Sequence, residues 1–263
     1  MYPWNFVIIE EGRQLERENS IEFKVSGRYA LFSDPINRIG GEKFSYQVPT
    51  YQSLKGILES VYWKPTLKWI IDEVRVMNLI KTQSQGIRPV NFGGTTGGKG
   101  NPLNTLSIYT YLANVEYQVK AHFEWNYNRP NLEPDRNENK HYLISKRMIK
   151  CGGRRDVFLG TRECQAYVEP CKFGEGQGAY DNYGSLSFGL MFHGFDYPDE
   201  TGEDKLIARL WTPEMNNGYI KFYRPDECTI KREILSMKPK VFDETNFSGY
   251  AEFEKEGEII ELD

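Results

Sequence analysis

The chain has 263 residues, of which 39% are hydrophobic and 27% are charged, and its net charge is −4. This composition excludes an intrinsically disordered chain, and no run approaches the roughly 20 apolar residues that span a membrane. The length suffices for one large domain whose core needs neither disulfides nor a metal. The four cysteines form no CxxC pair and no secretory signal is evident, so we expect reduced thiols in a cytoplasmic protein.

The charge is distributed unevenly along the chain. Residues 243–263 carry −7, which leaves +3 for the part that precedes them. Within that part, residues 140–155 contain six lysines and arginines and no acid. A local basic patch attracts a phosphate backbone even when the whole chain is acidic. This basic run therefore suggests a nucleic-acid partner, although a solvated helix face gives the same pattern.

Strands and a helix alternate in the first part of the predicted fold. After an N-terminal arm of residues 1–19, residues 21–32 alternate as in a strand. A helix is expected to begin near Pro49 and to end before Pro65. One face of this helix carries four apolar residues at helical spacing, namely Leu54, Ile57, Leu58 and Val61. Residues 67–77 are rich in Ile, Val and Trp and form the next predicted strand.

The middle of the chain contains the clearest strand pattern. Residues 92–105 hold five glycines and are expected to form a mobile hairpin loop. In residues 115–125, apolar and polar side chains then alternate at every position, which predicts a strand with one buried face. Asp135 is the expected N-cap of a second helix that runs to about Lys150. Residues 155–168 predict a further pair of strands.

The order strand, helix, strand, strand, helix, strand is typical of the ferredoxin-like fold, in which both helices cover one face of a four-stranded sheet. We therefore predict an α+β protein with a ferredoxin-like domain over residues 20–180. A small antiparallel β annex is expected over residues 181–242, followed by an acidic tail at 243–263. The strands of the annex are predicted at residues 186–192, 205–211 and 219–223.

The three histidines are the first candidates for chemistry. Neither an HExxH nor a GxSxG motif occurs, so we expect no metal, no cofactor and no serine nucleophile. His141 follows Lys140 near the start of the second predicted helix, beside the basic run. A histidine transfers protons near neutral pH, and a lysine stabilises negative charge. Cleavage of RNA by its own 2′-hydroxyl requires both functions. The start of a helix also favours the binding of a phosphate.

Tyr62 is the third candidate, because the two helices of a ferredoxin-like fold lie side by side. Its position at the end of the first predicted helix allows it to reach the same site. A phenol has a pKa near 10, so we expect Tyr62 to orient the 2′-hydroxyl or to stabilise charge. The ordinary alternatives are a packed tyrosine for Tyr62, a solvated cation for Lys140 and a helix-cap contact for His141.

Four longer motifs resemble those of one known family, and they occur in the same order along the chain. They are GGEKFSYQVPTYQSLKGI at 40–57, SVYWKPT at 60–66, YQVKAHFEWN at 117–126 and GGRRDVFLGTRECQAYV at 152–168. Over roughly residues 20–242 the chain resembles the fifth CRISPR-associated protein family, in its d subtype, from the type I-C system. Members of that family have ferredoxin-like folds of the RNA-recognition and RAMP type with a β-rich C-terminal part.

The resemblance implies a metal-independent endoribonuclease that cleaves CRISPR precursor RNA at the 3′ base of the repeat hairpin. Attack by the 2′-hydroxyl implies a 2′,3′-cyclic phosphate product. The protein is then expected to retain the 5′ handle and to join the backbone and large subunits of the type I-C surveillance complex. The family's catalytic tyrosine, lysine and histidine correspond to Tyr62, Lys140 and His141.

Further residues are expected to bind the RNA or to let it approach. Basic residues and one histidine are the candidates for RNA contacts, namely Lys120, His122, Lys146, Arg147, Arg154, Arg155 and Arg162. The expected glycine-rich loop contains Gly152, Gly153 and Gly160. The ordinary alternatives are solvent exposure for Lys120 and His122, and a helix cap or a hairpin turn for the glycines.

Two other functions remain open at this point. The first is a non-catalytic scaffold that caps the 5′ handle of the guide RNA in the same complex. The second and weaker one is a metal-dependent nuclease acting on DNA, for which Glu116, Glu124 and Asp135 would be ligands, although no ExK or DxD cluster marks a two-metal site.

Overall fold

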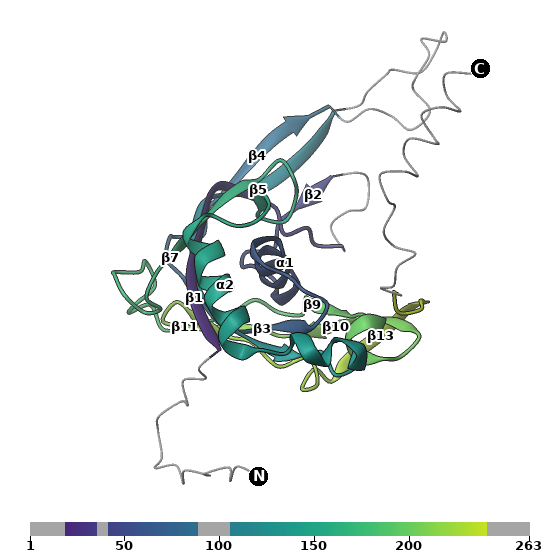
Figure 1. The fold of residues 1–263 in the computed structure, drawn as a ribbon. Coiled ribbons are helices and arrows are strands. Elements are labelled where there is room, and N and C mark those ends of the chain that lie inside the picture. Colours follow the sequence, from purple (N-terminus) through teal and green to yellow (C-terminus); the bar gives the residue numbers. More distant parts are fainter. Residues whose placement is uncertain (1–18, 36–41, 89–105, 241–263) are drawn as a thin grey trace, which may run out of the picture.

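The structure is a computed structural model that describes residues 19–35, 42–88 and 106–240 (Figure 1). The expected glycine-rich hairpin loop at 92–105 and the acidic tail at 243–263 lie outside the described residues. The same holds for the expected N-terminal arm, apart from Asn19.

A curved antiparallel sheet forms the centre of the molecule and holds α1 on its concave side (Figure 1). Its four central strands lie in the order β7-β1-β5-β3. The strands are β1 (Ser20–Ala30), β3 (Leu67–Val76), β5 (Ser107–Trp125) and β7 (Gln165–Pro170). The helices are α1 (Tyr51–Val61) between β1 and β3, and α2 (Glu138–Lys150) between β5 and β7. This order and connectivity confirm the predicted ferredoxin-like fold.

The apolar pattern of the sequence explains which faces are buried. In β5, the side chains of Tyr117, Val119, Ala121 and Phe123 are buried in the main core, as the two-residue period predicts. The predicted apolar stripe of α1 is also buried. Each buried Val, Leu, Ile or Phe side chain of these elements stabilises the fold by roughly 1.5–3 kcal/mol when it leaves water. Thr50 caps α1 by accepting a hydrogen bond from the backbone N–H of Ser53 at 3.1 Å.

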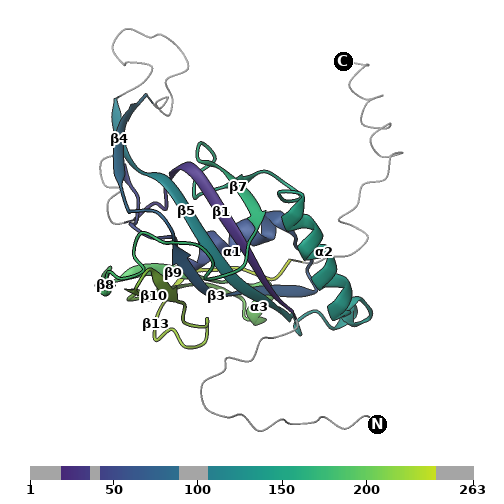
Figure 2. The ribbon, with the colours of Figure 1, turned by 90° about the vertical axis from the view of Figure 1, so that its left-hand side faces the viewer.

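Two strands in the first part of the main sheet were not predicted, namely β2 (Lys43–Phe44), which is short, and β4 (Thr82–Ile87), which is polar. The strand β6 (Val157–Phe158) pairs with β7, which confirms the pair of strands predicted in residues 155–168. In addition, β5 begins eight residues before the predicted strand at 115–125. Figure 2 shows the hairpin of β4 and β5 extending beyond the rest of the sheet. Most side chains of β4 are exposed there, so its sequence carries no apolar alternation that would have revealed it.

The C-terminal strands divide between two sheets, which the predicted annex did not anticipate. The main sheet continues past β3 through β12 (Tyr219–Lys221), β11 (Glu214–Asn216) and β8 (Ser185–Ser187). The boundary between residues 180 and 181 stays a prediction, but strand pairing crosses it.

The second sheet has three antiparallel strands, β9 (Met191–Asp196), β10 (Lys205–Trp211) and β13 (Ile230–Ser236), with the short helix α3 (Pro198–Thr201) after β9. The predicted strand at 186–192 is therefore wrong as one element, because Gly189 turns the chain at a φ of 70° between β8 and β9.

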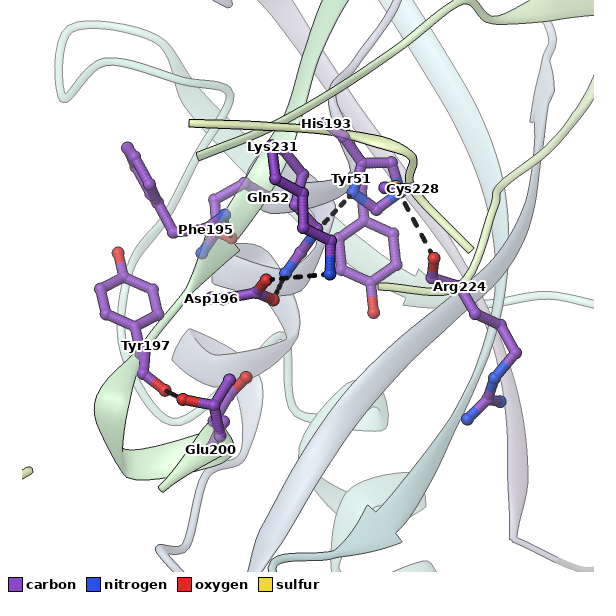
Figure 3. A network of polar contacts seen from close by, with 12 residues as sticks. Tyr51, Gln52, His193, Phe195, Asp196, Tyr197, Glu200, Arg224, Cys228 and Lys231 are labelled. Carbon is purple, nitrogen blue, oxygen red and sulfur yellow. Dashed lines mark hydrogen bonds and ion pairs between the residues drawn. The ribbon is translucent and has the colours of Figure 1, made fainter. Parts of the chain in front are cut away.

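A buried polar network joins the second sheet to α1 (Figure 3). The ring of His193 stacks on Tyr51 with 4.4 Å between the ring centroids, and its Nε2–H donates to the carbonyl of Tyr223 at 2.9 Å. Arg209 donates to Nδ1 of His193 at 3.3 Å and pairs with Asp196. His193 is fully buried.

The start of α2 differs from the prediction. A 3-10 helix, η2 (Pro130–Asp135), precedes it, and Asn137 is the N-cap, whose side chain accepts from the N–H of Lys140 at 3.0 Å. Asp135 is therefore not the cap. Asn and Asp cap helices equally well, and the carboxylate of Asp135 is engaged elsewhere. Within the described ranges, no helix has the length and apolar character needed to cross a bilayer.

Candidate active site

Tyr62 and His141 meet between the two helices of the ferredoxin-like fold. Tyr62 follows the last residue of α1, where its N–H donates to the carbonyl of Leu58 and its own carbonyl accepts from the indole of Trp69, both at 2.8 Å. These two bonds fix the backbone of Tyr62. Its hydroxyl oxygen lies 2.7 Å from Nδ1 of His141, in the first turn of α2. The predicted meeting of these two side chains is therefore present.

The surroundings of His141 fix its tautomer. Nε2 lies 2.8 Å from the backbone carbonyl of Asp135, and a carbonyl only accepts hydrogen bonds. Nε2 therefore carries the proton, and in the neutral ring Nδ1 accepts the hydrogen bond from Tyr62. The rings of Trp125 and Phe123 pack on the imidazole at 5.6 and 6.2 Å between centroids. Both nitrogens of His141 are thus engaged, and its ring is held by aromatic contacts.

Burial keeps both members of this pair neutral. His141 has no exposed surface and Tyr62 is 5% exposed. Burial lowers the pKa of His141, and the charges of Lys140 and Lys64 lower it further, whereas Asp135 acts in the opposite direction. Burial and the charge of Asp135 raise the pKa of Tyr62, which Arg154 partly offsets. The phenol therefore keeps its proton, and Tyr62 is the more exposed member of the pair.

Lys140 reaches the same site through Asp135. Its ammonium group forms an ion pair with the Asp135 carboxylate, which also accepts from the hydroxyl of Thr66 at 2.7 Å. Burial alone would raise the pKa of Asp135, but these hydrogen bonds outweigh it and hold the pKa below its ordinary value. The Lys140 side chain is 42% exposed, so solvent reaches this ion pair.

Two further cations, Lys64 and Arg154, lie near Tyr62 and His141, on the segments that follow α1 and α2. The N–H groups of Arg154 and Arg155 donate to the carbonyls of Val61 and Ser60 at 3.2 Å. Arg154 is exposed, and so is Lys64, which follows Trp63 in the YWKPT motif. Together with Lys140, these side chains place positive charge around a phenol and an imidazole.

The outer face of α2 carries the other basic residues of the predicted run. Lys146, Arg147 and Lys150 are exposed there, and the ammonium group of Lys146 lies 5.1 Å from the centre of the Tyr142 ring. These residues form a basic surface that leads away from Tyr62 and Lys140.

Lys120 and His122 lie on the other face of the sheet from the helices. His122 is 3% exposed, which contradicts plain solvent exposure. Its Nδ1 lies 2.8 Å from the carboxylate of Asp72, and its Nε2 lies 3.5 Å from that of Glu124. His122 and Lys120 both line one surface pocket, in which Lys120 lies beside Glu73. The structure does not bring these two residues to Tyr62 and His141, and their RNA contacts stay a prediction.

Gly160 and Arg162 lie at the opposite end of β1 from the pair. Residue 20 at the start of β1 pairs with His122, whereas Leu31, beyond its end, bonds to Leu159. The ten residues between the two ends of β1 correspond to a strand length of about 33 Å. Gly160 has a φ of 93°, and a Cβ there would lie 2.0 Å from the carbonyl oxygen of Leu31. The need for glycine at this turn is therefore internal, and Arg162 lies over the ring of Phe158 at 5.9 Å.

Gly152 and Gly153 end α2 in left-handed conformations, with φ of 82° and 110°. The N–H of Gly153 donates to the carbonyl of Met148 at 2.8 Å. They therefore have the role of a helix cap, and a contact with RNA stays a prediction for them.

Sequence reasoning missed Thr66, Lys64 and the true position of Asp135 in the site. Two of these residues stand in the SVYWKPT motif that carries Tyr62, which is the signal that could have found them. No group of three or more His, Cys, Asp or Glu side chains is arranged for a metal ion in the part of the chain that the structure describes.

Comparisons with known proteins agree with this architecture. The model of the Cas5d family, described as "CRISPR-associated protein (Cas_Cas5)", matches residues 20–223. A protein of Mannheimia succiniciproducens named CRISPR pre-crRNA endoribonuclease Cas5d is 26% identical over 167 residues, which cover 57% of this chain and 71% of the relative. A Thermus thermophilus protein of the same name is 29% identical over 153 residues, which cover 57% of this chain and 63% of the relative.

Two solved structures share the fold. One, a CRISPR-associated protein, is 36% identical with a TM-score of 0.67, and the match covers 81% of this chain and 96% of that one. The other, a functionally uncharacterised protein of Streptococcus mutans, is 38% identical with a TM-score of 0.66, and the match covers 83% of this chain and 100% of that one. The chain therefore belongs to the Cas5d family of CRISPR-associated proteins.

Proposed function

We propose that this protein is a metal-independent endoribonuclease that cleaves CRISPR precursor RNA at the 3′ base of the repeat hairpin. The observation that carries the proposal is the hydrogen bond between Tyr62 and Nδ1 of His141, together with the exposed side chain of Lys140, which pairs with Asp135 next to His141. Two relatives named pre-crRNA endoribonuclease support the substrate class. The family resemblance of the motifs supports the cut at the hairpin base.

The proposed reaction begins with the 2′-hydroxyl of the nucleotide before the cut. Its proton passes to the oxygen of Tyr62 while the proton of Tyr62 passes to Nδ1 of His141, which becomes an imidazolium ion. The 2′-oxygen attacks the phosphorus atom, and the bond between phosphorus and the 5′-oxygen breaks. This relay suits the site, since His141 has no exposed surface and meets the substrate only through Tyr62.

Lys140 serves the phosphate and the leaving group in this proposal. Its ammonium group stabilises the negative charge that develops on the phosphate oxygens. It then gives a proton to the departing 5′-oxygen and regains one as the imidazolium of His141 releases its proton through solvent. The products are a 2′,3′-cyclic phosphate and a 5′-hydroxyl, and no net proton is consumed.

The exposed cations of α2 and of the segment after it are proposed to hold the RNA. Lys146, Arg147, Arg154 and Arg155 are all exposed. Such contacts bind the backbone without reading its sequence. They suit the proposed retention of the 5′ handle and entry into the type I-C surveillance complex with its backbone and large subunits.

The proposal is tested with purified protein and a labelled repeat-hairpin RNA in EDTA. We expect cleavage that continues in the chelator and leaves a 2′,3′-cyclic phosphate. The variant His141→Ala should lose cleavage and keep RNA binding. A reaction that stops in EDTA and returns with a divalent cation would contradict the proposal and favour the metal-dependent alternative.

A second candidate is a non-catalytic scaffold that caps the 5′ handle of the guide RNA. The observation that favours it is that both nitrogens of His141 are already engaged, Nδ1 by Tyr62 and Nε2 by the carbonyl of Asp135. This candidate predicts tight binding of repeat RNA with no cut in the same assay. Cleavage by the purified protein would exclude it as the whole function, although both roles can follow one another in one protein.

A further inference from the structure

Asp135 contacts two of the three predicted catalytic residues, His141 and Lys140, and it also contacts Thr66. Its backbone carbonyl accepts from Nε2–H of His141 at 2.8 Å. Its carboxylate pairs with the ammonium group of Lys140 and accepts from the hydroxyl of Thr66 at 2.7 Å. The oxygen that accepts from Thr66, Oδ2, also lies 3.5 Å from Nε2 of His141, whereas Oδ1 pairs with Lys140. One residue thus contacts both the imidazole and the cation of the proposed reaction.

The position of this carboxylate has a chemical consequence for His141. The proposed relay turns a buried neutral imidazole into an imidazolium ion, which burial strongly disfavours. A negative charge at 3.5 Å from Nε2 favours that ion, and it lies opposite the nitrogen that receives the proton from Tyr62. The other charged groups that act on the imidazole are Lys140 and Lys64, and both disfavour the imidazolium. Asp135 is thus the anion that compensates them.

The position of Thr66 suggests that the carboxylate is held in a fixed orientation. Thr66 is buried at 1% exposure, directly before β3, and its N-terminal neighbours in the chain lead back to Tyr62. Its carbonyl accepts from the N–H of Asn126 at 2.8 Å, which fixes the backbone of this segment to the end of β5. A buried hydroxyl that donates to a carboxylate restricts its rotation.

We propose, on the basis of the proposed endoribonuclease function, that Asp135 is a positioning residue for cleavage. Its carboxylate stabilises the imidazolium form of His141 and directs the ammonium group of Lys140, and Thr66 holds that carboxylate in place. Asp135 does not contact the RNA in this account. It acts through the two side chains that take part in the proton transfers.

The variant Asp135→Asn tests this proposal, because it keeps the shape and the backbone carbonyl while it removes the charge and replaces one accepting oxygen by an NH2 group. We expect the single-turnover cleavage rate to fall about tenfold, as a loss of about one unit in the pKa of the imidazole would cause. The acidic limb of the pH–rate profile should move to lower pH, while the Kd for repeat RNA stays within about twofold. Thr66→Val should shift both quantities in the same direction by a smaller factor.

Glu138→Gln is the matched control, because Glu138 is an exposed acid in the first turn of the same helix. It should leave the cleavage rate and the pH profile unchanged. An unchanged rate in Asp135→Asn, or a lower rate with an unmoved pH limb, would overturn the proposal.

NMR titration of His141 in the free protein separates this proposal from the proposed function. Asp135→Asn should lower the pKa of His141 relative to the wild type whether or not the protein cleaves RNA. An unchanged pKa would overturn the role of Asp135. A wild type that fails to cleave while the pKa shift is present would instead overturn the endoribonuclease. If Asp135→Asn does not fold, the titration of Thr66→Val gives the same decision.

Discussion

The hydroxyl oxygen of Tyr62 lies 2.7 Å from Nδ1 of His141, although 79 residues separate the two in the chain. One residue caps the C-terminus of α1, and the other lies in the first turn of α2. Their contact therefore depends on the packing of both helices on one face of the sheet. A proton relay through this hydrogen bond requires both groups at once.

Tyr62→Phe and His141→Ala are predicted to have non-additive effects on cleavage. Each variant alone should lower the single-turnover rate by about 10²-fold or more, because each removes the proton relay. The double variant should be hardly slower than either single variant, since residues that act as a unit lose their contribution once. Rates and RNA affinities of the three variants check this. Two effects that multiply in the double variant would contradict the relay.

The pH dependence of cleavage is predicted from the lowered pKa of His141. The ring acts as a base in its neutral form, so activity is lost as pH falls through its folded-state pKa, which lies below the ordinary 6.5. The raised pKa of Tyr62 keeps the phenol protonated at neutral pH. We expect a rate that is constant from pH 7 to 9 and falls only below 6.5. A midpoint above 7 would contradict this account.

Protein stability is predicted to fall in mild acid because of His193. Burial and the nearby Arg209 lower the pKa of His193 to about 3, whereas it is about 6.5 in the unfolded chain. Between pH 6.5 and 3, the imidazole is therefore protonated in the unfolded chain and neutral in the folded protein. The contribution of His193 to the free energy of unfolding is complete above pH 6.5 and declines as the pH falls toward 3. The loss from this residue reaches about 2 kcal/mol at pH 5.

Urea unfolding at several pH values between 7 and 5 measures this decline, in a range where most carboxylates stay ionised. The variant His193→Gln removes the titrating group and should show a smaller slope of unfolding free energy against pH. An equal slope in wild type and variant would show that His193 does not titrate as described.

Gly160→Ala is predicted to destabilise the fold much more than Gly152→Ala. Both glycines have a positive φ, but only at Gly160 does an added Cβ meet the backbone, 2.0 Å from the carbonyl oxygen of Leu31. We expect a loss of about 3 kcal/mol or more for Gly160→Ala and about 1 kcal/mol for Gly152→Ala. Denaturant unfolding checks both values. Equal losses would contradict the close approach at Gly160.

Much of the fold could be predicted from the sequence, because periodic burial determines it. The alternation in residues 115–125 and the stripe of Leu54, Ile57, Leu58 and Val61 appear in the structure as buried faces. The hairpin strand β4 could not be predicted, since most of its side chains are exposed and carry no pattern. The division of the C-terminal strands between two sheets was also missed, because pairing between distant strands leaves no local signal.

The residue types of the site could be predicted from the sequence, but their arrangement in space could not. Tyr62, Lys140 and His141 were named from their chemistry and from the resemblance, and the structure brings Tyr62 and His141 into hydrogen-bond contact. The roles of the three residues stay proposals. Asp135 was expected to cap the helix, because a carboxylate near a helix start has two possible uses, and only packing decides between a cap and an ion pair with Lys140.

The most direct test of the central claim uses one modified repeat RNA. The wild-type cut is first mapped, and the nucleotide before it is then replaced by its 2′-deoxy form. Single-turnover cleavage of the modified and unmodified hairpins is compared in EDTA at equal occupancy of the protein. The account predicts no cut of the modified hairpin at that position, with unchanged binding. Cleavage of the modified hairpin at the normal rate would contradict attack by the 2′-hydroxyl and, with it, the role assigned to Tyr62 and His141.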